Sequence, residues 1–159
     1  MPRTAPVLWS RWIGFLSLLL IIYGLAMVFM PQMMNSTLVG PLLYHTELLR
    51  SAFARLAEPE LIFVNVLTGL IGSVTTGWAI VFGWIALEPF RKGERWAWNA
   101  MAAGVTAWAV LEGYVKLANG LGVWSLAHIS LLVAYGIPLL ATYRHFHPSS
   151  VDNIQNKDR

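Results

Sequence analysis

The chain has 159 residues, of which 57% are hydrophobic and 12% are charged, about half of the ~25% charged residues in a typical soluble domain. Its formal net charge is +3, but the basic residues lie at the ends of apolar runs, which indicates membrane topology and not a nucleic-acid surface. The absence of cysteine excludes disulfide bonds and thiolate metal sites.

The first apolar run covers residues 12–30 and follows two basic residues, Arg3 and Arg11. It is too long for the apolar region of a signal peptide, and no small-residue cleavage site follows it. We therefore expect an uncleaved helix that ends at Pro31. At ~1.5 Å per residue it covers about 29 Å, which is enough to cross the hydrocarbon core. Tyr23 is a polar side chain inside this run.

The connection that follows is too polar to span, but residues 41–58 fit an amphipathic helix that lies along the outer face of the membrane or caps the bundle. His45 falls at the edge of its apolar stripe. This histidine is either simply packed there or faces a pocket beneath the cap. The stripe is formed by Leu42, Leu49, Phe53 and Leu56.

The second apolar run covers residues 61–87 and is long enough to require a tilt. Its threonines can bond to carbonyls of their own helix, whereas Asn65 needs a partner from another segment or a water. Small side chains recur at every fourth position and predict a face that another helix can approach closely. They are Gly69, Ser73 and Gly77.

A short basic loop at residues 88–95 ends the second run, and Trp96 and Trp98 then open the third as interfacial anchors. The preceding Gly-Trp pair and the sequence Phe-Arg-Lys-Gly-Glu-Arg-Trp-Ala-Trp at 90–98 resemble those of a family of small, uncharacterised bacterial integral membrane proteins with four helices. The resemblance covers about residues 60–140. It implies a helical membrane fold and supplies no activity.

The third span is predicted over residues 96–118 and the fourth over 122–143. Asn119 and the glycines after it form the turn between them, because both residue types tolerate the backbone angles of a tight reversal. Pro138 lies inside the fourth span and removes the helical donor of the Ala134 carbonyl, so a kink is expected there.

The predicted fold is all-α: four transmembrane helices in an antiparallel bundle, plus one amphipathic interfacial helix on the outer side. Residues 1–147 form this single transmembrane domain and residues 148–159 a polar tail. Most lysines and arginines fall in the termini and in the 88–95 loop, on one side of the four spans. The positive-inside rule then places both termini in the cytoplasm and the protein in the inner (plasma) membrane as a multi-pass protein.

Polar residues of the four spans are expected near one depth. Glu112 and His128 lie equally far from the turn between the last two spans, and Lys116 is one helical turn from Glu112 on the same face. Ionisable groups inside a membrane are costly and usually face the bundle interior or a wet cavity. The other segments bring further polar groups to a similar depth: Tyr23, Asn65 and Thr68, with His45 closing the layer from outside.

A buried carboxyl beside a lysine and a histidine can hold or release a proton, as a general acid must. We therefore interpret the layer as a pocket for a lipophilic small molecule, in which Glu112 and His128 would be the catalytic pair if the protein is an enzyme. A purely structural pair that fixes helix register is an equal alternative. The ligand-binding residues are predicted to be Tyr23, His45, Asn65, Thr68, Trp108, Tyr114, Lys116 and Trp124.

Two other functions are compatible with the sequence. The first is an accessory structural subunit of a larger membrane complex. The second is a proton-coupled carrier that works as a homodimer. The expected partners are the lipid bilayer, a lipophilic ligand, and membrane proteins or a second copy of the chain, with no nucleic acid.

No metal ion or cofactor is predicted. Met27, Met30 and Met34 recur at helical spacing and thioethers suit copper(I), but flexible packing is the simpler interpretation because no thiolate accompanies them. A haem bridged by His128 needs His45 as its second ligand, and His45 lies on a peripheral segment.

Overall fold

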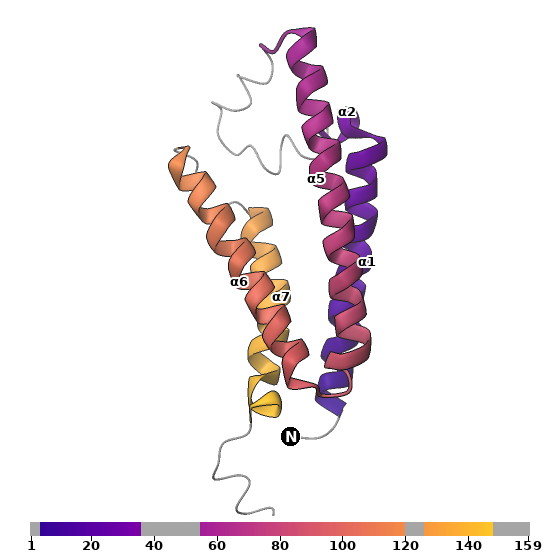
Figure 1. Cartoon of the computed structure of the whole chain (residues 1–159), viewed down its shortest axis with the longest axis vertical. Helices are drawn as coiled ribbons and strands as arrows, with labels where there is room; N and C mark the ends of the chain where they lie inside the picture. The colour runs from indigo at the N-terminus through magenta and orange to yellow at the C-terminus, as the bar shows by residue number, and fades with distance from the viewer. Residues whose placement is uncertain (1–3, 36–54, 120–125, 148–159) are drawn as a thin grey trace, which may run out of the picture.

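The computed structural model describes residues 4–35, 55–119 and 126–147, and this part of the chain is helical apart from short turns. Two helix pairs make up the fold, α1 with α5 and α6 with α7. The pairs meet near the first turns of α1 and lie apart at their other ends (Figure 1). The elements are α1 (Thr4–Phe29), α2 (Pro31–Met33), α5 (Glu58–Ile85), the π-helical turn η2 (Ala86–Phe90), α6 (Arg95–Ala118) and α7 (Leu126–Phe146).

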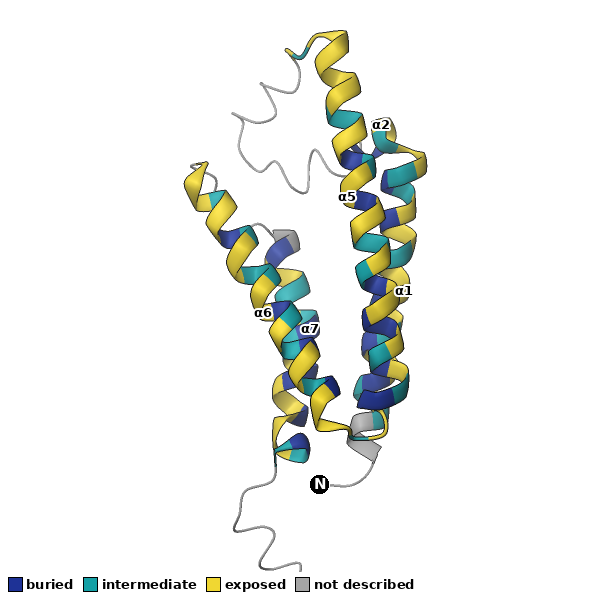
Figure 2. Ribbon diagram, viewed as in Figure 1, coloured by how far each residue is buried: buried dark blue, intermediate teal, exposed yellow. Residues whose placement is uncertain are grey.

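Two of the described helices are long and apolar enough to cross a membrane. They are Val7–Phe29 and Glu58–Phe90, and most of each lies outside the protein core. Figure 2 shows exposed residues along the outer faces of both, and many of these are large apolar side chains, such as Phe29, Val74 and Trp84. Contiguous apolar surface of this kind suits lipid and is costly in water. The third and fourth predicted spans correspond to α6 and α7, which do not meet the same criterion of length and hydropathy.

The ends of the first two long helices differ from the prediction. α1 starts eight residues before the predicted residue 12, since Pro6 lies in the first helical turn, where a missing N–H costs nothing. α5 starts at Glu58, and the Glu60 carboxylate accepts a hydrogen bond of 2.7 Å from the backbone N–H of Ala57. The predicted interfacial helix over 41–58 is therefore wrong at its end, because residues 55–57 are not helical. Its residues 41–54 lie outside the described ranges.

α1 and α5 cross at two glycines. A Cβ atom at Gly72 would lie 2.6 Å from the Gly24 carbonyl oxygen, and one at Gly24 would lie 2.7 Å from the Gly72 carbonyl oxygen. The backbones are therefore in direct contact at this point. Gly69 and Gly77 lie on the face predicted to receive a helix, and among the described residues outside α5 none lies within 4 Å of a Cβ atom built at either position. The neighbouring helix thus uses a different small-residue face of α5.

The main apolar core lies where the two helix pairs meet. Phe82 packs against Trp78 and, edge to face, against Tyr135, with ring centroids 4.1 and 5.9 Å apart. Residues from every long helix contribute to this cluster, which holds the pairs together at one end. Its buried members are Ile13, Phe82, Ala86, Phe90, Ala97, Met101, Val105, Tyr135, Leu139 and Phe146.

The carbonyl freed by Pro138 has a donor from another helix. Trp12 Nε1 donates to the Ala134 carbonyl oxygen at 3.1 Å, which replaces the missing backbone N–H of residue 138. The Thr142 hydroxyl donates to the Pro138 carbonyl oxygen at 2.7 Å. A backbone carbonyl that has lost its helical donor needs such a substitute, because unpaired backbone groups away from water are costly. α7 is thus fixed to α1 at its proline.

The loop between η2 and α6 is short and charged. Gly93 takes a positive φ of 83°, which L-residues rarely adopt. Glu88 Oε2 and Lys92 Nζ form an exposed ion pair at 2.6 Å, and the hydrogen bond that Lys92 donates to this carboxylate raises the pKa of Lys92. Such an exposed pair is screened by water and contributes little to stability.

Candidate functional site

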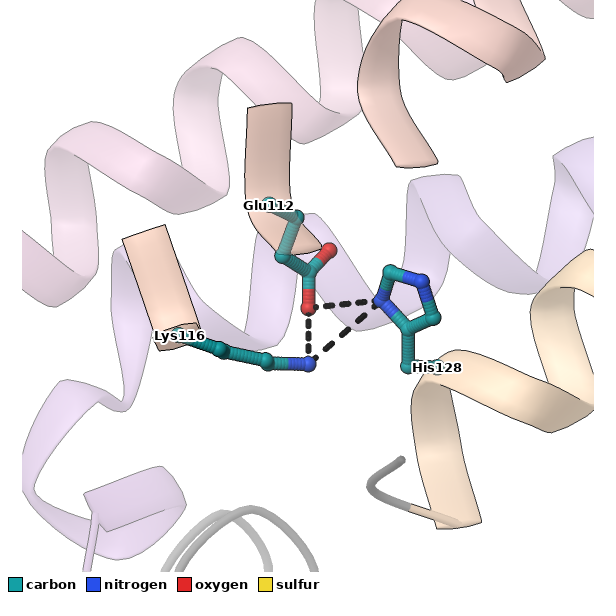
Figure 3. Close-up of polar contacts among 3 residues, drawn as sticks. All are labelled: Glu112, Lys116 and His128. Atoms are coloured by element: carbon teal, nitrogen blue, oxygen red, sulfur yellow. Dashed lines mark hydrogen bonds and ion pairs between the residues drawn. The ribbon is translucent and has the colours of Figure 1, made fainter. Parts of the chain in front are cut away.

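Three of the predicted site residues form one polar cluster between α6 and α7. Glu112 and Lys116 lie one turn apart on α6, and His128 lies in the first turn of α7. Glu112 Oε1 is 2.5 Å from Lys116 Nζ and 3.1 Å from His128 Nδ1. The three side chains point toward one another (Figure 3). Glu112 and His128, which the sequence placed equally far from the turn, thus contact each other across this helix pair.

The cluster is only partly open to its surroundings. The side chain of His128 is 3% exposed, that of Lys116 14% and that of Glu112 30%. The Trp108 ring stacks on the His128 imidazole, with centroids 4.8 Å apart and planes at 25°. Because Trp108 lies one turn before Glu112, residues 108, 112 and 116 share one face of α6. The aromatic ring covers the histidine, and the carboxylate is the most accessible member.

The position of His128 Nδ1 gives the cluster its chemical character. This nitrogen lies 3.1 Å from the Glu112 carboxylate and 3.4 Å from the Lys116 ammonium. A protonated Nδ1 donates to the carboxylate, whereas an unprotonated Nδ1 accepts from the ammonium. Nδ1 therefore has a partner in either state. This buried nitrogen is therefore not left unpaired, which would cost about 1–3 kcal/mol.

Two other predicted residues form a separate cluster on the α1–α5 pair. Asn35 Nδ2 donates to Asn65 Oδ1 at 2.9 Å, and the Thr68 hydroxyl donates to Asn35 Oδ1 at 3.0 Å. Asn65 thus has the partner that the sequence required. Asn35, which is buried, was not among the predicted residues because it follows Pro31 in a segment assigned to a connection. The residues predicted to form one polar layer therefore belong to at least two separate hydrogen-bond networks, one on α6 and α7 and one that includes Asn65 and Thr68 on α5.

The remaining predicted residues lie apart from the cluster or outside the described ranges. Tyr114 is 69% exposed, and positions two apart on a helix do not face the same way, so it points away from Glu112. Tyr23 on α1 is 37% exposed. His45 and Trp124 fall outside the described residues, so their predicted roles have no structural account.

A surface groove lies between α1 and α7, on residues that were not predicted to form a site. Its volume is about 540 Å³. Its walls are apolar except for Ser130, two positions after His128, and it includes the tryptophan that donates to the Ala134 carbonyl. No sequence motif marks it, because its two walls are distant in the chain. The groove is lined by Trp9, Trp12, Ser130, Val133, Ala134 and Ile137.

The methionines of the first span pack together. Met27 and Met34 are buried in one small cluster with Ala26, and Met30 is 53% exposed. This arrangement favours packing over copper binding. Across residues 4–35, 55–119 and 126–147, no group of three histidine, aspartate or glutamate side chains is placed to hold a metal ion.

Comparisons with models of protein families, with curated proteins and with solved structures found no match. The function is therefore argued from the residues of this chain.

Proposed function

We propose that the protein is a four-span membrane protein in which α6 and α7 cross the bilayer together with α1 and α5. α6 and α7 have 24 and 21 residues, so each is about 30 Å or longer. Their outward side chains are apolar, among them Val110, Leu111 and Leu140. Glu112 and Lys116, the two charged residues in the C-terminal half of α6, are paired with each other, which reduces the cost of burying them. The lysines and arginines of the termini and the 88–95 loop favour a cytoplasmic location for both.

Single cysteines test this topology cleanly, because the chain has none of its own. We expect Asn119→Cys to react with a membrane-impermeant maleimide added to intact spheroplasts, since the α6–α7 turn would face outward. Lys92→Cys is the matched control in the opposite loop, and it should react only after permeabilisation. Equal labelling of both positions from one side would contradict the four-span arrangement.

Within this fold we propose that the cluster of Glu112, Lys116 and His128 binds a lipophilic small molecule through a polar group. The observation that carries the proposal is the single oxygen, Glu112 Oε1, shared by Lys116 Nζ and His128 Nδ1 under an aromatic cover. A ligand oxygen or nitrogen can replace one of these partners without leaving a buried atom unsatisfied. The surrounding low dielectric strengthens such a bond.

If the protein is an enzyme, proton transfer is the reaction that this geometry supports best. The carboxylate holds the imidazole in a fixed orientation, and the imidazole exchanges a proton with a bound substrate. Glu112 would act as acid, base or orienting group for His128, as in other carboxylate–histidine pairs. Isomerisation, cyclisation and epoxide opening are reactions of lipophilic substrates that need only such a pair.

Replacing Glu112 tests the site against a structural role. We expect Glu112→Gln to retain at least tenfold less of the co-purifying ligand, measured by mass spectrometry of organic extracts, because a neutral amide binds the Lys116 ammonium and the His128 imidazole more weakly than a carboxylate does. Glu88→Gln removes the carboxylate of the other i,i+4 Glu–Lys pair and is expected to retain the ligand. Glu112→Gln also leaves the Lys116 ammonium without its carboxylate, which can destabilise the fold. The double variant Glu112→Gln/Lys116→Gln removes both charges and therefore restores stability if the unpaired ammonium was the only defect. Full ligand retention in that double variant would contradict the site.

An accessory subunit is the second candidate, and one observation favours it. Gly69 and Gly77 lie on one face of α5, and a Cβ atom added at either glycine would meet none of the described residues outside α5 within 4 Å. A helix face formed by small residues lets a further helix approach closely. Co-purification of defined partner chains that are lost in Gly77→Leu would support this function. A chain that purifies alone and stays folded would contradict it.

A further inference from the structure

The 88–95 loop and the end of α7 form one surface at the end of the molecule where the helix pairs meet. The rings of Phe90 and Phe146 pack with centroids 4.8 Å apart. A Cβ atom at Gly93 would lie 3.5 Å from His145 Nε2, so the loop backbone runs directly beside the last turn of α7. Charged residues of the loop and of the last turn of α7, which are distant in sequence, are thereby brought to the same end of the molecule.

This surface carries three exposed arginines. Arg91 and Arg95 extend from the loop and the first residue of α6, and Arg144 from the last turn of α7. Among the described residues, no carboxylate forms an ion pair with any of the three. Two carboxylates lie nearby: Glu88 pairs with Lys92 at 2.6 Å and also interacts with the charge of Arg91, and Glu94 accepts a hydrogen bond from Trp96 Nε1 at 2.5 Å. The three arginines and Lys92 outnumber these two carboxylates, so the surface is positively charged.

The surface also lies at the level expected for lipid headgroups. Arg91 follows immediately after the candidate span that ends at Phe90. Trp96 is 55% exposed, and Trp98 contacts Tyr143 and His147 while its Nε1 donates to the Leu139 carbonyl oxygen at 2.9 Å. Tryptophan and tyrosine concentrate at the boundary between hydrocarbon and headgroups. The arginines are therefore placed where phosphates occur.

We propose that Arg91, Arg95 and Arg144 bind the phosphate of an anionic phospholipid at this surface. The planar guanidinium matches phosphate in two parallel hydrogen bonds, which lysine cannot reproduce. The acyl chains would lie on the apolar outer surface of the neighbouring helices. This proposal needs the membrane insertion of α5 and is independent of the Glu112 cluster.

The test is native mass spectrometry of the full chain in detergent, titrated with phosphatidylglycerol or with phosphatidylcholine. We expect tighter binding of phosphatidylglycerol, and a loss of about fivefold for each of Arg91→Gln and Arg144→Gln, the effect of one basic contact at a membrane surface. Lys92→Gln is the matched control. It lowers the net charge equally, but its ammonium is already paired with Glu88, so it should change binding little.

Three outcomes would overturn the proposal. Equal binding of the two lipids would show that the phosphate charge is not recognised. Equal losses for Lys92→Gln and Arg91→Gln would indicate diffuse attraction and not a site. Displacement of the lipid by inorganic phosphate at millimolar concentration would identify a free-anion site instead. The arginine variants should still carry any ligand that binds at the Glu112 cluster. Measuring that ligand in the same spectra distinguishes a failure of the lipid site from a failure of the proposed function.

Discussion

Replacing Gly72 with alanine is expected to destabilise the protein by about 3 kcal/mol, the upper end of the usual cost of overpacking. The new methyl group would lie 2.6 Å from both the Gly24 carbonyl oxygen and the Met27 Cβ atom. Both atoms belong to α1 and neither is at the end of a flexible side chain. The whole crossing of α1 and α5 would therefore have to open. The free energy of unfolding in mixed detergent micelles measures this effect.

Gly77→Ala is the matched control on the same helix. It makes the same chemical change at a position where a Cβ atom meets none of the described residues outside α5 within 4 Å. Only helix propensity then changes the free energy of unfolding, and it favours alanine over glycine by up to about 1 kcal/mol. The two variants should thus differ in sign. Equal effects at both positions would show that α1 does not cross α5 at Gly72, and stronger destabilisation at Gly77 would place the principal helix contact on the opposite face.

The second large effect is expected from Trp12→Phe, which should lower the unfolding free energy by about 1–3 kcal/mol. Phenylalanine keeps an aromatic ring but lacks the indole N–H that donates to the Ala134 carbonyl oxygen at 3.1 Å. Pro138 prevents the helix from supplying its own donor, so the carbonyl would lose this partner, and in the proposed membrane-spanning arrangement of α7 no water would replace it. Equilibrium unfolding in mixed micelles again provides the measurement.

A double-mutant cycle separates this bond from general packing of the tryptophan. Pro138→Ala restores the backbone N–H at residue 138, which can bond to the same carbonyl. Trp12→Phe should then cost less by about 1 kcal/mol or more in the Pro138→Ala background, since the lost packing is common to both backgrounds. An identical cost in both backgrounds would mean that the indole N–H does not serve the freed carbonyl.

The sequence predicted those features that follow from short-range rules. The bounds of α6 agree within one residue with the apolar run that begins at Trp96. Glu112 and Lys116 had to share a face because they are one helical turn apart. Equal distances to a turn rich in asparagine and glycine placed Glu112 and His128 at one depth, whereas their contact depends on how α6 and α7 are rotated against each other. The freed carbonyl of Ala134 followed from the chemistry of proline.

Features that depend on how helices pair could not be predicted in the same way. α5 has small residues on more than one face, and the sequence does not indicate whether α1 packs on Gly72 or on Gly77. The hydrogen bonds of Asn35 with Asn65 and Thr68 could not be predicted, because the segment around Asn35 has no helical periodicity. The indole of Trp12 reaches Ala134 across 122 positions of sequence, and no local pattern encodes such a contact.

Native mass spectrometry of the full chain, released gently from its membrane, tests the proposed ligand site most directly. The account predicts a monomer or dimer that carries a lipophilic small molecule, whose mass also identifies the chemistry bound near Glu112, Lys116 and His128. A chain found only with defined protein partners and with no small molecule would contradict the ligand site. The Glu112 cluster would then be a structural pair that fixes α6 against α7.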